Sequence, residues 1–274
     1  MGREEAAGAS DPVRGHFREL FRGVAQKCDL PPFPKVAARA LSLARDPKAR
    51  TDDVARVVTA DPTLAARVLR IANSVVYMRH EPPRTVRDAI VTVGFNTLRT
   101  ILIAASARSM YRADDPIAER LWTHALATAL AADELRDPRE PAGGRDFITG
   151  LLHDVGKLVF HQTDPDALAR LGYADEARER EVFGVTHAVV GGVLADMWGA
   201  PQGVADAIME HHVRPGCGLA GRIARADWVA HAIGFGSVTG DLPPPETIED
   251  TTVDLAAVSA KVSDALAAER AFFD

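Results

Sequence analysis

Apolar residues recur along the chain at steps of three and four residues, the spacing at which side chains share one face of an α-helix. Alternating runs of β-branched residues, which are typical of half-buried strands, are scarce. Alanine, the strongest helix former, is abundant. The pattern therefore predicts an all-α fold.

Caps, prolines and glycines divide the first half of the chain into short helices. Thr51 and Asp61-Pro62 are N-cap patterns, and Thr85 supplies another. Gly94 is suited to end a helix in the left-handed conformation. The helices predicted in this half are Lys35–Arg45, Thr51 to about Thr59, Thr63–Asn73, Val86–Val93, and one from Asn96 to about Met110.

The clearest boundary is Asp114-Asp115-Pro116, because the candidate ligands described below all follow it. After it we predict helices near Ile117–Leu135, Phe147–His161, Glu181–Trp198, Gly203–His212, Leu219–Ile233 and, beyond a proline-rich linker, Val253–Arg270. We divide the chain into a flexible N-terminus (1–16), an N-terminal helical subdomain (17–113), a metal-site subdomain (114–240), and a linker with a C-terminal helix (241–274).

The composition is that of an ordinary globular protein, since 47% of the 274 residues are hydrophobic and 26% are charged. The net charge of −6 argues against a nucleic-acid groove. A solvated face is the favoured interpretation for the neighbouring arginines of the first half, over a basic patch. These arginines are Arg67, Arg70, Arg84, Arg87 and Arg99.

Cysteine use and targeting signals point to a reducing compartment. Cys28 and Cys217 are the two cysteines, and neither stands in a CxxC motif, so no disulfide framework is indicated. The polar N-terminus has no apolar core of a secretory signal. Uninterrupted apolar runs such as Ile101–Ala105 are too short to cross a bilayer. We expect a cytoplasmic protein without a membrane span.

The segment Gly150-Leu151-Leu152-His153-Asp154-Val155-Gly156-Lys157 places a histidine and an aspartate in an apolar helical run. A buried charge is costly unless it is paired or bound to a metal. Residues of the same ligand type recur in apolar stripes elsewhere, namely His124, His187, His211, His212 and Asp227. Each has an ordinary alternative, such as a hydrogen-bonded core histidine or, for Asp227, an N-cap or a partner of Arg225. Together they favour a metal site, because two buried carboxylates resist ionising together without a cation.

The set is consistent with two metal ions. Asp154 has two oxygens and is able to bridge ions about 4 Å apart. One ion would be held by His124, His153 and Asp227, and the other by His187 with His211 or His212. Mixed imidazole and carboxylate ligands suit Fe, Mn or Zn better than Mg or Ca.

Lys157 shares a helix face with His153 and Asp154, where its ammonium would meet a phosphate oxygen. A surface lysine is the equally good alternative. Gly156 would allow another helix to approach closely, unless it is merely a tolerated helix glycine.

The His153-Asp154 segment resembles the signature of the HD superfamily of metal-dependent phosphohydrolases. More narrowly, the chain resembles the HDOD family of bacterial signalling proteins over about residues 17–240. The resemblance is carried by Leu30-Pro31-Pro32-Phe33-Pro34, Asp61-Pro62-Thr63-Leu64, the run from Val68 to Ser74, Ala89-Ile90 to Gly94, Phe183-Gly184-Val185-Thr186-His187, Trp198-Gly199-Ala200-Pro201, and Ala207-Ile208 to His211-His212.

That resemblance implies an N-terminal helical subdomain packed on an HD-like bundle and a regulatory or output role in signal transduction. With no second recognisable domain, the chain resembles a stand-alone HDOD protein. It also implies that His124, His153, Asp154 and Asp227 form a core metal quartet, with His187 and His211 or His212 as added ligands. The related cyclic-di-GMP phosphodiesterases have Glu and a Gly-Tyr-Pro loop after the double histidine. Here the sequence is Val213-Arg214-Pro215-Gly216, which makes cyclic-di-GMP hydrolysis an unfavourable interpretation.

Three functions remain open at this point. The first is a signalling module that binds a protein partner, with Asn73, Ser74, Tyr77 and Arg84 as part of a docking surface; their ordinary alternative is a helix end and a turn. The second is a phosphohydrolase acting on a nucleotide or phosphoester, with Asp154 and Lys157 in catalytic roles. The third is a purely structural metal.

Overall fold

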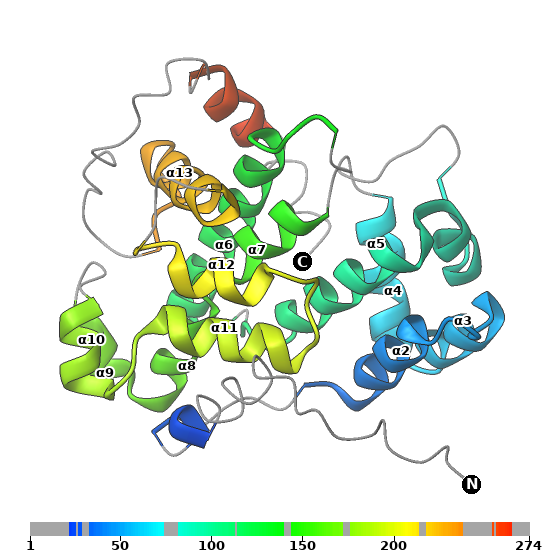
Figure 1. Cartoon of the computed structure of the whole chain (residues 1–274), viewed down its shortest axis with the longest axis horizontal. Helices are drawn as coiled ribbons and strands as arrows, with labels where there is room; N and C mark the ends of the chain where they lie inside the picture. Colours follow the sequence, from blue (N-terminus) through cyan, green and yellow to red (C-terminus); the bar gives the residue numbers. More distant parts are fainter. Residues whose placement is uncertain are drawn as a thin grey trace, which may run out of the picture.

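The structure is a computed structural model that describes residues 22–25, 27–28, 33–73, 82–112, 114–139, 144–171, 176–213, 218–237, 254 and 256–264. Every regular element within these residues is a helix, so the predicted all-α fold is confirmed. In chain order the helices are α2 (Lys35–Arg45), α3 (Thr51–Thr59), α4 (Pro62–Ala72), α5 (Val86–Arg108), α6 (Pro116–Glu134), α7 (Arg145–Leu152), α8 (Val155–Thr163), α9 (Pro165–Leu171), α10 (Glu176–Phe183), α11 (His187–Met197), α12 (Val204–Glu210) and α13 (Gly218–Ala232) (Figure 1).

The N-terminal helices α2 to α5 gather on one side of the molecule, where α2, α3 and α4 pack against α5 (Figure 1). Two of their boundaries follow the predicted caps. Thr51 was wrong as an N-cap, because it is the first residue of α3, the N-cap is Arg50, and no side chain caps this helix. The Asp61 carboxylate accepts a hydrogen bond from the Leu64 amide at 3.0 Å, and Pro62 occupies the first turn of α4. Thr85 and Asp88 form a reciprocal capping box at the start of α5.

Helix α5 is broken at Gly94, whose φ of 78° and ψ of 167° are not helical. The predicted end of a helix at this glycine is therefore confirmed. Among the described residues α5 is the one helix long and apolar enough to cross a membrane, and 56% of its apolar window is buried inside the protein. Because the break leaves only residues 95–108 as a continuous helix, it falls short of the about 20 residues that a span requires.

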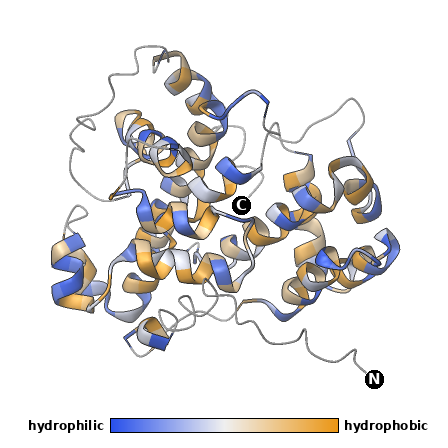
Figure 2. Cartoon of the chain, viewed as in Figure 1, coloured by the Kyte–Doolittle hydropathy of each residue, from blue (hydrophilic) through white to orange (hydrophobic). Residues whose placement is uncertain are grey.

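Helices α6 to α13 form the second group, with α6 packed against α7, α8 and α13, and α11 packed against α8 and α12. Most helices contribute apolar residues to the buried core, while α10 is largely polar (Figure 2). Helix α11 is buried along most of its length, from His187 to Ala195. The contact between α5 and α7 joins this group to the N-terminal helices.

Two predicted helices were wrong because each is in fact two helices. Phe147–His161 is interrupted at His153-Asp154, between α7 and α8. Glu181–Trp198 is interrupted before Thr186, which caps α11 by accepting a hydrogen bond from the Val189 amide at 3.3 Å. Helix α9 was not predicted, although Asp164-Pro165 repeats the Asp-Pro pattern that opens α4 and α6.

The C-terminal helix is described for residues 256–264 and docks on the same molecule. Val262 is 1% exposed, and Lys261 lies 3.4 Å from Glu134 at the end of α6. The predicted flexible N-terminus and the linker at 241–245 lie outside the described residues. The proposed division at residue 113 stays a prediction.

Candidate metal centre

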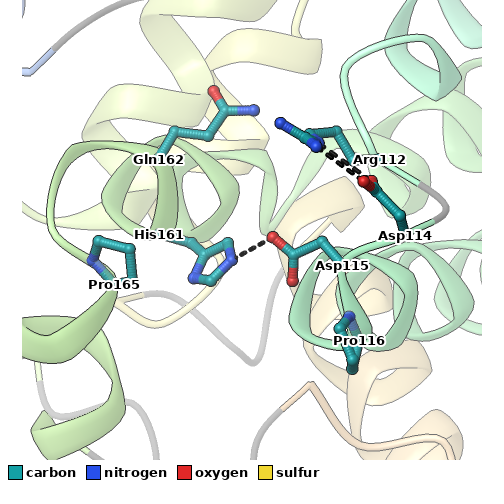
Figure 3. A pocket seen from close by; sticks show the side chains of 7 residues that line it. All are labelled: Arg112, Asp114, Asp115, Pro116, His161, Gln162 and Pro165. Atoms are coloured by element: carbon teal, nitrogen blue, oxygen red, sulfur yellow. Dashed lines mark hydrogen bonds and ion pairs between the residues drawn. The ribbon is translucent and has the colours of Figure 1, made fainter.

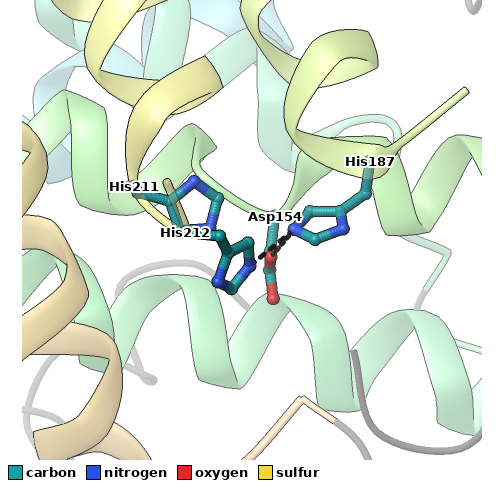
Figure 4. Close-up of side chains that lie close together, drawn as sticks. All are labelled: Asp154, His187, His211 and His212. Atoms are coloured by element: carbon teal, nitrogen blue, oxygen red, sulfur yellow. Dashed lines mark hydrogen bonds and ion pairs between the residues drawn. The ribbon is translucent and has the colours of Figure 1, made fainter. Parts of the chain in front are cut away.

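The ligand-type residues predicted from the sequence come together in the interior of the second group of helices. They are contributed by α6, by the junction of α7 and α8, by the start of α11, by the end of α12 and by α13. Figure 4 shows Asp154, His187, His211 and His212 facing one another. Exposed fractions are 0% for His124, His153 and His187, 1% for His211, 3% for Asp154 and 6% for Asp227.

Two of the histidines stand at helix ends and bind the carbonyl three residues earlier. Nδ1 of His153 lies 2.7 Å from the Gly150 carbonyl oxygen, and Nδ1 of His211 lies 2.6 Å from that of Ile208. Carbonyls in the last turn of a helix have no backbone partner within the helix, so an imidazole N–H is able to donate a hydrogen bond to one of them. Since a carbonyl only accepts, each Nδ1 carries a proton and Nε2 is the ring nitrogen that faces the centre.

Two further histidines are oriented in the same way by residues from other elements. Nδ1 of His124 donates to the carbonyl of Phe235 at 2.7 Å. Nδ1 of His187 lies 2.8 Å from both carboxylate oxygens of Glu179, and the His187 amide donates to the same carboxylate at 2.8 Å. Fixing Nδ1 in this way leaves Nε2 as the metal-binding atom, which is the usual arrangement around ligating histidines.

Asp154 lies between the two sets of imidazoles. Its Oδ2 is 3.4 Å from Nε2 of His124 and 3.5 Å from Nε2 of His153. Its Oδ1 is 3.2 Å from Nε2 of His187, outside hydrogen-bond geometry. The two oxygens therefore face different ligand groups, as a bridging carboxylate would.

The residues fit a divalent ion. Two ligand atoms bound at about 2.1 Å to one ion, at angles of 90–110°, lie about 3.0–3.5 Å apart. Nε2 of His124 is 3.3 Å from Nε2 of His153 and 3.1 Å from Oδ1 of Asp227. A cation or a proton between these two Nε2 atoms would remove the repulsion of their lone pairs. Oδ1 of Asp154, Oδ1 of Asp227 and Nε2 of His211 are buried without a hydrogen-bond partner among the described residues.

The carboxylates of the centre raise the pKa values of two of its histidines. Burial lowers the pKa of His124, but the nearby carboxylates of Asp154 and Asp227 outweigh it and raise that pKa to about 9. Burial likewise lowers the pKa of His187, and the Glu179 carboxylate overcomes this to raise it to about 9. Both imidazoles therefore lie in a field of negative charge, which favours a cation in the centre.

Lys157 is buried, at 3% exposed, and its ammonium lies 2.6 Å from Oδ2 of Asp154 and 3.2 Å from the Ser237 hydroxyl. Burial opposes the charged form, but the Asp154 carboxylate outweighs it and raises the pKa of Lys157. The surface-lysine alternative is therefore wrong. The ammonium pairs with the central carboxylate rather than with solvent.

The other predicted ligands also join the cluster. His212 places Nε2 3.1 Å from Nε2 of His187, and burial lowers its pKa to about 3. Ligand atoms of Asp154, His187, His211 and His212 all lie within 4.8 Å of one another, as do those of His124, His153 and Asp154.

Sequence reasoning missed two residues of the centre. His231 follows Asp227 by four residues on α13, and its Nε2 lies 3.5 Å from Oδ1 of Asp227; this i, i+4 spacing was the available signal. Glu179 stands among charged residues on α10 and carries no comparable signal, because only tertiary packing makes it 3% exposed.

Close helix approach around the centre depends on glycine, as predicted for Gly156. A Cβ there would lie 2.1 Å from the carbonyl oxygen of His187, so α8 and the start of α11 are in backbone contact. A Cβ on Gly150 would lie 2.8 Å from the backbone of Ala129 on α6. Helices that carry ligands therefore pack closer than any side chain would allow.

The predicted docking residues are only partly described. The Asn73 amide donates to the carbonyls of Leu69 at 2.9 Å and Pro83 at 3.0 Å, which is the behaviour of a residue that ends a helix. Arg84 is exposed, whereas Ser74 and Tyr77 lie outside the described residues. A docking role for these positions stays a prediction.

A pocket of about 480 Å³ lies away from the centre, where the start of α6 meets the end of α8 (Figure 3). His161 lies 2.6 Å from Asp115, and Arg112 lies 2.7 Å from Asp114. Asp115 also caps α6 through the Ile117 amide at 2.9 Å. Because these charges are paired with one another, the pocket does not indicate a second site.

Comparison with known proteins finds a relative among curated sequences. An uncharacterized protein of Treponema pallidum (strain Nichols) is 24% identical over 215 residues, covering 74% of this chain and 42% of that protein. The chain thus spans less than half the length of this curated relative.

Solved structures share the fold. An HDOD domain protein of unknown function from Geobacter sulfurreducens has a TM-score of 0.63 at 21% identity, over 95% of this chain and 96% of that one. A protein of Shewanella amazonensis SB2B, provisionally named a phosphohydrolase, has a TM-score of 0.66 at 25% identity, over 89% and 93% of the two chains. Residues 30–214 match the HDOD domain family. The chain therefore belongs to the HDOD family.

Proposed function

We propose that this HDOD chain is a signal-transduction module that binds a protein partner and holds one or two divalent ions in its buried centre. The observation that carries the proposal is a complete ligand set that is closed to solvent. The imidazoles of His124, His153 and His187 are 0% exposed. Such a centre is suited to holding ions and stabilising a conformation more than to exchanging substrate.

Lys157 supports the same interpretation. A lysine that served a substrate phosphate would need a free ammonium turned toward an accessible space. Here the ammonium is 3% exposed and engaged with Asp154 at 2.6 Å and with Ser237 at 3.2 Å. Its role is to balance the charge of the central carboxylate.

The experiment measures metal content and turnover together. Protein purified with and without oxygen is analysed for Fe, Mn and Zn, and then assayed with Mn or Fe on a panel of mono-, di- and cyclic nucleotides. We expect bound transition metal that is lost in His153→Ala, and no hydrolysis above the level of that variant. Protein that takes up none of these metals would contradict the proposal.

The second candidate is a metal-dependent phosphohydrolase, favoured by the bridging position of Asp154 and by the provisional name of the Shewanella amazonensis protein. A bound ion would supply a hydroxide nucleophile near neutral pH and polarise the phosphoryl group. Lys157 would then neutralise phosphate charge after leaving Asp154. Hydrolysis that disappears in both His153→Ala and Asp154→Ala would establish this activity.

The partner and compartment are also part of the proposal. The N-terminal helices contain none of the candidate ligands, which leaves their surface available for a protein partner. A net charge of −6 disfavours nucleic acid. A buried thiol at Cys28 suits the cytoplasm.

A further inference from the structure

Helix α11 connects the metal centre to the N-terminal helices. Its first residue is the ligand His187, and it ends at Met197, with Trp198 as the C-cap and Gly199 after it at a φ of 65°. A helix of this length spans about 16 Å. One end therefore lies in the centre, and the other end emerges beside α2.

Arg45, the last residue of α2, holds the far end of α11. Its Nη2 donates to the carbonyl of Gly199 at 2.7 Å and to that of Trp198 at 3.3 Å. A Cβ on Gly199 would lie 1.1 Å from Nη2, so the guanidinium occupies the space beside this glycine. A cation at the C-terminal end of a helix also interacts favourably with the helix dipole. The rings of Phe33 and Trp198 also pack together at this end of α11, with their centroids 5.4 Å apart.

A second basic residue of the N-terminal region holds the near end. The Lys27 ammonium donates to the carbonyl of Gly184 at 2.6 Å. Gly184 stands in the short turn between α10, which carries Glu179, and α11, which carries His187. The N-terminal region therefore contacts the turn before α11 as well as the end after it.

Helix α11 has no room to move without moving its ligand. At Gly156, α8 touches the backbone of His187 directly. A Cβ on Gly191 would lie 3.4 Å from the carbonyl oxygens of Leu152 and His153. A displacement at the Trp198 end is thus carried along a rigid, buried helix to Nε2 of His187, which lies 3.2 Å from Oδ1 of Asp154.

We propose that Arg45 is a positioning residue for the metal centre, acting through α11 to hold His187 against Asp154. The N-terminal helices thereby set the affinity of the ion held by Asp154, His187, His211 and His212. This rests on the proposed function, since it presupposes a bound ion. A partner that draws Arg45 away from α11 loosens that ion, and by thermodynamic linkage the ion strengthens the contact of α2 with α11.

The test is a double-mutant cycle read out by metal binding. The metal-free 274-residue chain is titrated with Co²⁺, whose absorption reports its ligands, in wild type, Arg45→Ala, His187→Ala and the double variant. Arg39→Ala is the matched control, because Arg39 lies on the same helix and is exposed. Lys27→Ala is the second variant, and thermal unfolding without metal checks that each protein is folded.

We expect Arg45→Ala to weaken one Co²⁺ site by about ten- to a hundred-fold, the usual effect of losing a residue that orients a ligand. The other Co²⁺ site and Arg39→Ala should stay at the wild-type affinity. In the His187→Ala background, removing Arg45 should cause no further loss.

A Co²⁺ affinity of Arg45→Ala equal to that of Arg39→Ala would overturn this inference and leave the proposed function standing. A full additional loss of Co²⁺ affinity when Arg45 is removed in the His187→Ala background would do the same. Wild-type protein that takes up no Co²⁺ overturns the proposed function as well.

Discussion

Gly156→Ala tests whether helix contact at the centre is as close as the structure shows. The new Cβ would lie 2.1 Å from the carbonyl oxygen of His187 and 2.7 Å from its carbonyl carbon and Cα. A carbon and an oxygen in contact lie about 3.3 Å apart. Helices α8 and α11 must therefore separate by about 1 Å, and His187 must move with its helix.

The stability change follows from opposing terms. Overpacking of this kind costs about 1–3 kcal/mol, while replacing a helical glycine by alanine gains at most about 1 kcal/mol. The expected net loss is about 1–2 kcal/mol, which lowers the melting temperature by about 2–8 °C in a protein of this size. Denaturant unfolding of the metal-free protein measures it.

The same substitution should also weaken metal binding. Ligand distances tolerate about 0.2 Å, so a shift of about 1 Å at His187 should weaken Co²⁺ binding by at least ten-fold. The control is Gly23→Ala, because a Cβ on Gly23 meets nothing within 4 Å. Unfolding and Co²⁺ binding of Gly156→Ala that match both wild type and this control would refute the reasoning.

Three further predictions concern charge and orientation in the centre. Glu179→Gln removes the carboxylate that holds Nδ1 of His187 and should weaken metal binding about ten- to a hundred-fold, measured by calorimetry. Lys157→Met removes the ammonium that lies 2.6 Å from Asp154. The Co²⁺ affinity should rise, and the melting temperature of the metal-free protein should fall. A change of both quantities in the same direction would contradict this prediction. Because the pKa values of His124 and His187 are raised to about 9 without metal, the ion must displace protons below that pH. Affinity should therefore increase from pH 6.5 to 9, and a flat profile would count against it.

The helices of the N-terminal group were predictable because their ends are marked locally. Asp61-Pro62 and Thr85 act through their own side chains within one turn, so α4 and α5 begin where these patterns place them. The break at His153-Asp154 was not predictable from periodicity, since apolar residues continue through it. It depends on the hydrogen bond between the His153 ring and the Gly150 carbonyl oxygen, and no local propensity indicates that bond.

The same distinction holds for the candidate site. Histidines and aspartates in apolar stripes are unusual enough to be singled out one by one, and the structure brings all of those named into one cluster. Glu179 was missed because its neighbours on α10 are charged, as on any solvated helix. It becomes part of the centre only when the Thr186 cap turns the chain and sets His187 against it.

The ion pair between Lys157 and Asp154 separates folding from metal uptake. A carboxylate buried at the crossing of several helices would ordinarily require its ion during assembly of the core. Here a counter-charge three residues away on the chain is available from the start of folding. The core would therefore be able to assemble before any ion arrives, and stripping a bound ion would return a folded protein. Metal occupancy would then be a variable of the finished protein, free to rise and fall with supply.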